Sequence, residues 1–177
     1  MTSRRVLLVL NLQVGLISDP PQGIPAAQSV RENIALVLEH ARRASAEQAP
    51  CIIHFRNCGE PGDLDEEGTP TWELLHPPLP GEFVFDKRKT NAFSCTALDE
   101  HVAPDAEVVV VGLMSEYSVK SSASILPDPR GAGGGELVDG GRLTPAEKIS
   151  AQVEEELDKA GAIILDMKYL PGLFEGR

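Results

Sequence analysis

The chain alternates short, continuous apolar runs with segments in which apolar residues recur every three or four positions. The runs Val6–Leu10 and Val108–Val111 are typical of strands that are covered on both faces, and Cys51–Phe55, interrupted by His54, also indicates a strand. Between Val6–Leu10 and Cys51–Phe55, the segment Ala26–Ala46 has the apolar period of a helix that buries one side. Strand, helix and strand in this order indicate a parallel sheet with helical crossovers.

Weaker signals predict the remaining elements. We expect short strands at Phe83–Lys87, Leu137–Asp139 and Ala162–Met167, and helices at Ala97–His101, at Glu116–Ile125 and from Thr144 onward. The last helix has a capping box, Thr144 to Glu147, with proline at its first helical position. A loop rich in glycine, proline and acidic residues, 57–82, separates the second and third strands.

These elements predict one domain over residues 1–177. Right-handed crossovers between parallel strands place helices on both faces of a sheet. We therefore expect a three-layer α/β/α sandwich with a six-stranded, mainly parallel sheet. In such sheets ligands bind at the carboxyl ends of the strands. Four segments meet this condition: Leu10–Leu16, Phe55–Gly59, Asp86–Thr90 and Gly112–Ser118.

Charge and cysteine content exclude several classes of partner. The chain has 27 acidic and 16 basic residues and a formal net charge of −11, which argues against binding to nucleic acid or to an anionic membrane. The apolar runs are too short for a transmembrane helix. Three unpatterned cysteines favour reduced thiols, and we expect a cytoplasmic protein.

Common catalytic motifs do not account for the sequence. The chain contains no phosphate-binding GxxxxGK[ST] motif, and no histidine follows His101, as a serine hydrolase of the α/β type would require. The four histidines are too scattered for a typical metal site. We expect neither a metal nor a cofactor.

The segment Gly112–Ser124 is a strand end, a polar turn and the start of a helix, which is a common place for a nucleophile. Its turn contains Ser115 and Ser118 but no cysteine. Together with Leu7–Leu16 and Phe85–Phe93, it resembles the motifs of the isochorismatase-like, or cysteine hydrolase, superfamily. That resemblance implies the sandwich fold described above, a homodimer or larger homo-oligomer, and a cis peptide bond between Leu113 and Met114.

The resemblance also implies a catalytic triad, two of whose members are replaced here. Asn11 occupies the position of the family's aspartate, Ser118 occupies that of its cysteine, and Lys87 retains its lysine. An amide cannot accept or donate a proton as a carboxyl group does. A serine hydroxyl is also far less acidic than a thiol. Ser118 is therefore either a nucleophile that needs another base or a hydroxyl that caps a helix.

Lys87 could take over part of the lost chemistry. Burial without an acidic partner favours the neutral amine, which can act as a base or form an imine. Glu116 and Asp86 are possible replacement carboxylates, although strand alternation directs Asp86 to the opposite face. Cys95 could place a thiol near the pocket.

Several further residues are candidates for contacts with a small molecule. The resemblance and the positions of the aromatic residues select Gln13, Trp72, Phe93, Leu113, Met114, Glu116 and Tyr117. Two functions are open at this point. The protein could be an enzyme that acts on a small cyclic, amide or vinyl-ether molecule, or a catalytically silent relative that binds a ligand or a partner protein.

Overall fold

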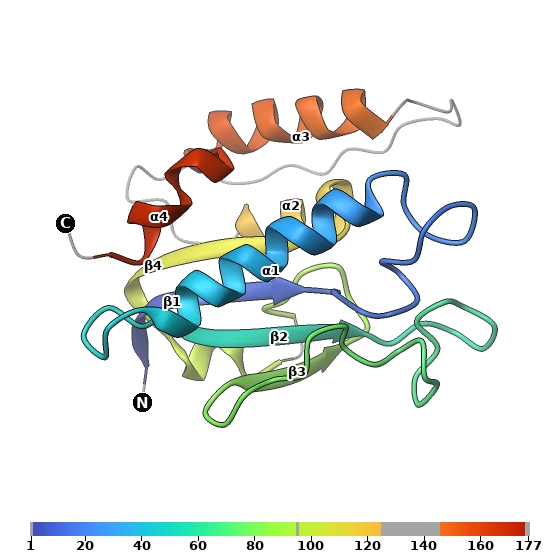
Figure 1. The fold of residues 1–177 in the computed structure, drawn as a ribbon, viewed down its shortest axis with the longest axis horizontal. Coiled ribbons are helices and arrows are strands. Elements are labelled where there is room, and N and C mark those ends of the chain that lie inside the picture. The colour runs from blue at the N-terminus through green and yellow to red at the C-terminus, as the bar shows by residue number, and fades with distance from the viewer. Residues whose placement is uncertain (1, 95, 125–145, 176–177) are drawn as a thin grey trace.

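The computed structural model describes residues 2–94, 96–124 and 146–175 and contains a four-stranded parallel sheet (Figure 1). Its strands are β1 (Ser3–Leu10), β2 (Cys51–Asn57), β3 (Phe83–Lys87) and β4 (Val102–Gly112), in the order β3-β2-β1-β4. Every neighbouring pair is parallel. The predicted α/β class with a parallel sheet is therefore confirmed.

The prediction of six strands is wrong for the described part of the chain. The segment predicted as the last strand, 162–167, has no helix or strand over 162–166 and then enters a 3-10 turn, η3 (Met167–Tyr169). Ile163, Ile164 and Leu165 are exposed, Ile163 by 81%. An apolar run becomes a strand only when a neighbour pairs with its backbone, and no neighbouring strand is described here. The predicted strand at 137–139 lies outside the described residues.

The helices are α1 (Ala27–Arg43), α2 (Lys120–Ala123), α3 (Ala146–Lys159) and α4 (Leu170–Leu173). The helices α1, α2 and α3 follow the predicted pattern with altered ends, whereas α4 lies in a tail for which no helix was predicted. The segment predicted as a helix from Glu116 begins instead with a π-helical turn, η2 (Ser115–Val119), which leads into α2. The predicted helix near residue 97 is a single 3-10 turn, η1 (Leu98–Glu100).

Two apolar clusters cover the two faces of β1. Leu7 and Val9 belong to one cluster, which includes the inner side of α1 and residues of α4. Leu8 and Leu10 belong to the other, together with Phe55 of β2. This alternation is the period of two that a strand imposes on its side chains. Burial on both faces explains why β1 is a continuous apolar run.

A buried ionic network connects α1 and β2 with the loop that precedes β3. Glu82 accepts hydrogen bonds from Arg42 at 2.7 and 2.9 Å, and its Oε2 lies 2.8 Å from Nε2 of His54. These bonds lower the pKa of Glu82 to about 2 against the opposing effect of burial.

The described helices include none with the length and apolar content of a membrane span.

Candidate functional site

Three polar side chains from separate segments meet at the carboxyl edge of the sheet. Asn11 follows β1, Lys87 ends β3, and Ser118 lies in η2 after β4. Ser118 Oγ accepts hydrogen bonds from Lys87 Nζ at 3.0 Å and from Asn11 Nδ2 at 2.9 Å. The three residues are only 3–6% exposed. The structure thus brings together the three positions that the sequence motifs selected.

The turn between β4 and η2 has an unusual backbone. Gly112 has a φ of +137°, and the peptide bond between Leu113 and Met114 is cis, which confirms the sequence prediction. The Leu113 N–H donates to the carbonyl of Leu10 at 2.9 Å. This bond holds the end of β1 against the turn, and it therefore fixes Asn11 relative to Ser118.

Asn11 is oriented as a hydrogen-bond donor. Its Nδ2 donates to the Leu113 carbonyl at 2.8 Å as well as to Ser118 Oγ. A carbonyl oxygen can only accept, so the contact with Leu113 fixes which end of the amide faces the serine. A carboxylate at this position would present an acceptor to both atoms. Asn11 has a φ of 55°, a conformation that asparagine tolerates better than most residues.

The pKa of Lys87 lies close enough to neutral pH for both the ammonium and the neutral amine to be present. Burial lowers the pKa of Lys87 to about 8, and the charges of Asp65 and Cys58 act in the opposite direction. Besides Ser118, Nζ contacts only the Lys89 carbonyl among the hydrogen bonds of the described residues, at 3.1 Å. Near neutral pH part of the Lys87 population is therefore neutral and able to accept a proton.

Gln13 and Trp72 support the neighbouring loop. Gln13 is fully buried, and its amide group bonds to both backbone groups of Asn57 at 2.8 and 2.9 Å and to the Trp72 carbonyl at 2.9 Å. The Trp72 ring stacks under the guanidinium of Arg56 at 3.6 Å, and its buried indole N–H has no hydrogen-bond partner among the described residues. Both predicted ligand contacts are thus engaged within the protein.

The remaining predicted contact residues differ in their exposure. Phe93 packs against the apolar cluster that includes Leu10, and Leu113 is buried in the cluster on the other face. Met114 and Tyr117 are 39% and 52% exposed beside Ser118. Their side chains are the ones on this turn that an approaching molecule can meet first.

The two carboxylates proposed from sequence do not act on Lys87. Glu116 accepts a long hydrogen bond of 3.4 Å from Ser115 in its own turn. Asp86 pairs with Arg56 at 2.7 Å, in agreement with its predicted position on the other side of the strand. Cys95 lies outside the described residues.

Asp65 and Cys58, which sequence reasoning missed, are the charged and titratable groups that act on Lys87. Both are buried, with 7% and 8% exposure. Asp65 lies in the long irregular loop, where no periodic pattern indicates which side chains turn inward. Cys58 directly follows β2, so its place at the carboxyl end of a strand was the available signal.

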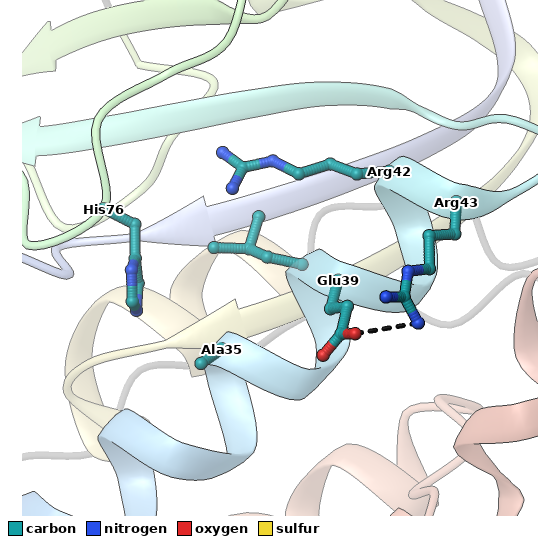
Figure 2. A pocket seen from close by; sticks show the side chains of 6 residues that line it. Ala35, Glu39, Arg42, Arg43 and His76 are labelled. Carbon is teal, nitrogen blue, oxygen red and sulfur yellow. Dashed lines mark ion pairs between the residues drawn. The ribbon is translucent and has the colours of Figure 1, made fainter.

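A cavity of about 260 Å³ lies between α1 and His76, away from the three catalytic candidates (Figure 2). Its two arginines are paired within the protein, Arg43 with Glu39 and Arg42 with Glu82. Its lining includes no serine, cysteine or lysine. The cavity therefore contains none of the residues that the sequence motifs selected.

Comparison with known protein families agrees with the motifs at this site. The family model described as "Isochorismatase domain" matches residues 5–126, which include Asn11, Lys87 and Ser118. A streptothricin hydrolase from Streptomyces noursei is 33% identical over 123 residues, which are 67% of this chain and 43% of that protein. A second streptothricin hydrolase from the same organism is 34% identical, with 47% of its length covered. The chain thus spans less than half the length of these curated relatives.

Solved structures show the same fold. An isochorismatase from Pseudomonas putida is 28% identical with a TM-score of 0.57, and the match covers 68% of this chain and 61% of that one. A protein from Oleispira antarctica, provisionally named an isochorismatase hydrolase, is 21% identical with a TM-score of 0.74. That second match covers 97% of this chain and 99% of the other.

Proposed function

Because the chain belongs to the isochorismatase family, we propose that it hydrolyses a small amide with Ser118 as the nucleophile and Lys87 as the general base. The observation that supports this proposal is the pair of hydrogen bonds to Ser118 Oγ from Lys87 Nζ and Asn11 Nδ2. A nucleophile within hydrogen-bond reach of a base that is partly neutral at physiological pH is the arrangement that hydrolytic catalysis needs.

The two substitutions in the family triad complement each other in this mechanism. A serine alkoxide is a much stronger base than a thiolate, so it needs more stabilisation. Asn11 donates a hydrogen bond to the atom that becomes negative, whereas a carboxylate there would repel it. Lys87 then replaces the carboxylate as the proton acceptor. Asn11 and Ser118 are therefore compatible with each other in this mechanism. Either replacement without the other would not give a consistent mechanism.

The reaction proceeds in two halves. Neutral Lys87 takes the Ser118 hydroxyl proton while Oγ attacks the amide carbon, and the carbon–nitrogen bond then breaks as the Lys87 ammonium returns this proton to the leaving nitrogen. In the second half Lys87 takes a proton from water, the resulting hydroxide attacks the acyl-serine ester, and the proton returns to Ser118. The products are a carboxylic acid and an amine.

A silent binding protein is the second candidate function. Asn11 cannot carry out the acid–base role of the family's aspartate. If Lys87 stays protonated as well, no residue of the triad can accept the Ser118 proton, and the protein is inactive as a hydrolase. A vinyl-ether cleavage that depends on an acid at position 11 is disfavoured for the same reason. Reactivity of Ser118 separates the enzyme from the silent binder without knowledge of the natural substrate.

We expect a fluorophosphonate probe to label Ser118, because such probes phosphonylate serines that a base activates. The labelling rate should rise with pH through a midpoint near 8, where Lys87 becomes neutral. Mass spectrometry of peptides locates the adduct. Ser118→Ala should abolish labelling and Lys87→Met should slow it strongly, whereas Ser115→Ala, which changes a serine of the same turn, should retain it. Absence of an adduct at Ser118 in the unmodified protein would reject the catalytic proposal.

A cysteine at position 118 should have a depressed pKa. In Ser118→Cys, the Lys87 ammonium and the Asn11 N–H both favour the thiolate, and neighbouring cations lower thiol pKa values from about 8.5 to about 3.5–7.5. Alkylation by iodoacetamide, followed by peptide mapping, should reach half its maximal rate at a lower pH at position 118 than in the control Ser115→Cys. Equal midpoints would mean that Lys87 does not act on position 118.

A further inference from the structure

The family pattern places its acidic residue directly after β1, where this chain has Asn11. A buried carboxylate of this chain, Asp65, lies instead in the loop after β2. We infer that Asp65 is the positioning carboxylate of the Ser118–Lys87 pair, held by a hydrogen bond from Asn57, the residue paired with Lys87 across β2 and β3. This inference rests on the proposed roles of Ser118 and Lys87. It assigns a function to a loop residue that lies outside the three family motifs.

A chain of short hydrogen bonds fixes Asp65 in place. Asn57 Nδ2 donates to Asp65 Oδ2 at 2.6 Å. The backbone of Asn57 is held on both sides by the buried amide of Gln13. Asn57 is also the register partner of Lys87 in the pairing of β2 with β3. The position of the carboxylate is therefore tied to the strand that ends in Lys87.

The backbone around Asp65 closes this arrangement. Its carbonyl accepts a bond from the Gly59 N–H at 2.9 Å, and the Cys58 N–H donates to the Lys87 carbonyl at 2.9 Å. A side chain on Gly59 would place its Cβ 2.3 Å from Asp65 Oδ1. The absence of a side chain on Gly59 thus lets the carboxylate pack against the segment that follows β2.

A purely structural role does not require a charge at position 65. A buried carboxylate is costly unless it is bonded and balanced by a cation, and an asparagine could make the bond to Asn57 without that cost. The Lys87 ammonium supplies the balancing charge at a distance, because its hydrogen bonds are to Ser118 and the Lys89 carbonyl. Asp65 therefore supports the charged form of Lys87 while leaving the amine in contact with the nucleophile.

The proposed reaction needs both forms of Lys87. The neutral amine removes the proton of Ser118, and the ammonium protonates the leaving nitrogen. Burial alone would favour the neutral form too strongly for the second step. The titratable groups that act on Lys87 are Asp65 and Cys58, both from the segment after β2, while Asn11 and Ser118 present neutral groups. Asp65 is the carboxylate among them, and burial raises the pKa of the Cys58 thiol.

Titration of Lys87 by NMR tests this inference directly, with protein labelled at the lysine Cε carbon and Lys87→Met to assign the signal. In Asp65→Asn the pKa of Lys87 should fall by about one unit, because an opposite charge nearby is removed. Asn57→Ala should also lower the pKa of Lys87, because it removes the hydrogen bond that holds the Asp65 carboxylate and so releases or neutralises that group. Asn57→Ala is the alternative variant if Asp65→Asn does not fold. Asp63→Asn, an exposed neighbour in the same loop, should leave the pKa unchanged.

The pH dependence of fluorophosphonate labelling provides the functional measurement. In Asp65→Asn its midpoint should move to lower pH by the same amount, a change that a general loss of stability would not produce. An unchanged Lys87 titration in both Asp65→Asn and Asn57→Ala would overturn the role of Asp65 even if Ser118 is labelled. Conversely, a shifted titration without any Ser118 adduct would reject the catalytic proposal and retain the electrostatic link between Asp65 and Lys87.

Discussion

Replacing Lys87 with methionine is expected to lower the rate of Ser118 labelling, and of amide hydrolysis once a substrate is known, by about 100- to 10,000-fold. This is the range associated with loss of a general base. Methionine keeps the length and the apolar stem of lysine, so the variant removes the amine with little change in packing. The measurements are the initial labelling rate at pH 8 and the corresponding hydrolysis rate.

The same variant should be more stable than the unmodified protein. The pKa of Lys87 is about 8 in the folded protein, below its ordinary value of 10.5. Below pH 8 the lysine is protonated in both states, and the folded state bears the full cost of burying the charge. Stability should rise as the pH increases from 8 to 10.5, where only the unfolded chain binds the proton. Lys87→Met should remove this dependence and raise the free energy of unfolding at pH 7 by up to about 3 kcal/mol, the equivalent of the lowered pKa.

Lys89→Met is the matched control for both measurements. Lys89 is exposed and only two residues away, so its replacement should change neither the labelling rate nor the stability profile. Urea denaturation at several pH values gives the free energies of unfolding. If Lys87→Met labels at a normal rate, Lys87 is not the base. If it loses stability at pH 7, the burial cost assigned to the ammonium is wrong.

A second large effect is expected from Gly112→Ala, which should cost about 3–5 kcal/mol of folding free energy. Gly112 has a φ of +137°, where residues with a side chain are strained, and a Cβ there would lie 2.1 Å from the Leu10 carbonyl oxygen. Both obstacles are backbone features, so no rotamer change can relieve them. Because Asn11 follows Leu10 directly, the forced displacement should also disrupt the hydrogen bonds to Ser118.

Gly62→Ala separates the cost of the backbone conformation from that of the close contact. Gly62 also has a positive φ, +95°, but no atom lies within 4 Å of the position that a Cβ would take. Its replacement should cost only about 1 kcal/mol. The two variants can be compared by their urea midpoints at constant m-value. Equal losses of stability in Gly112→Ala and Gly62→Ala would show that β1 and the turn at Gly112 are not packed as closely as described.

The sequence by itself determined the central strands and the meeting point of the catalytic candidates. Val6–Leu10 is a continuous apolar run because β1 is buried on both faces. Asn11, Lys87 and Ser118 each follow or end a strand-like segment. Parallel strands bring their carboxyl ends to one edge of a sheet, so local patterns placed the segments that contain these residues at that edge, and the resemblance to the family selected the three residues within them. Strand alternation also placed Asp86 correctly, on the side away from Lys87.

The tertiary structure alone decided the strand count and the partners of each polar group. The apolar segment 162–167 has the composition of a strand, but strand formation depends on a neighbour that local sequence does not specify. Gln13 is a polar residue after a strand, and only the folded loop shows that its amide binds Asn57 rather than facing outward. Asp65 lies in an irregular loop without a periodic pattern. Its proximity to Lys87 arises from hydrogen bonds between residues distant in sequence, and such contacts leave no local signal.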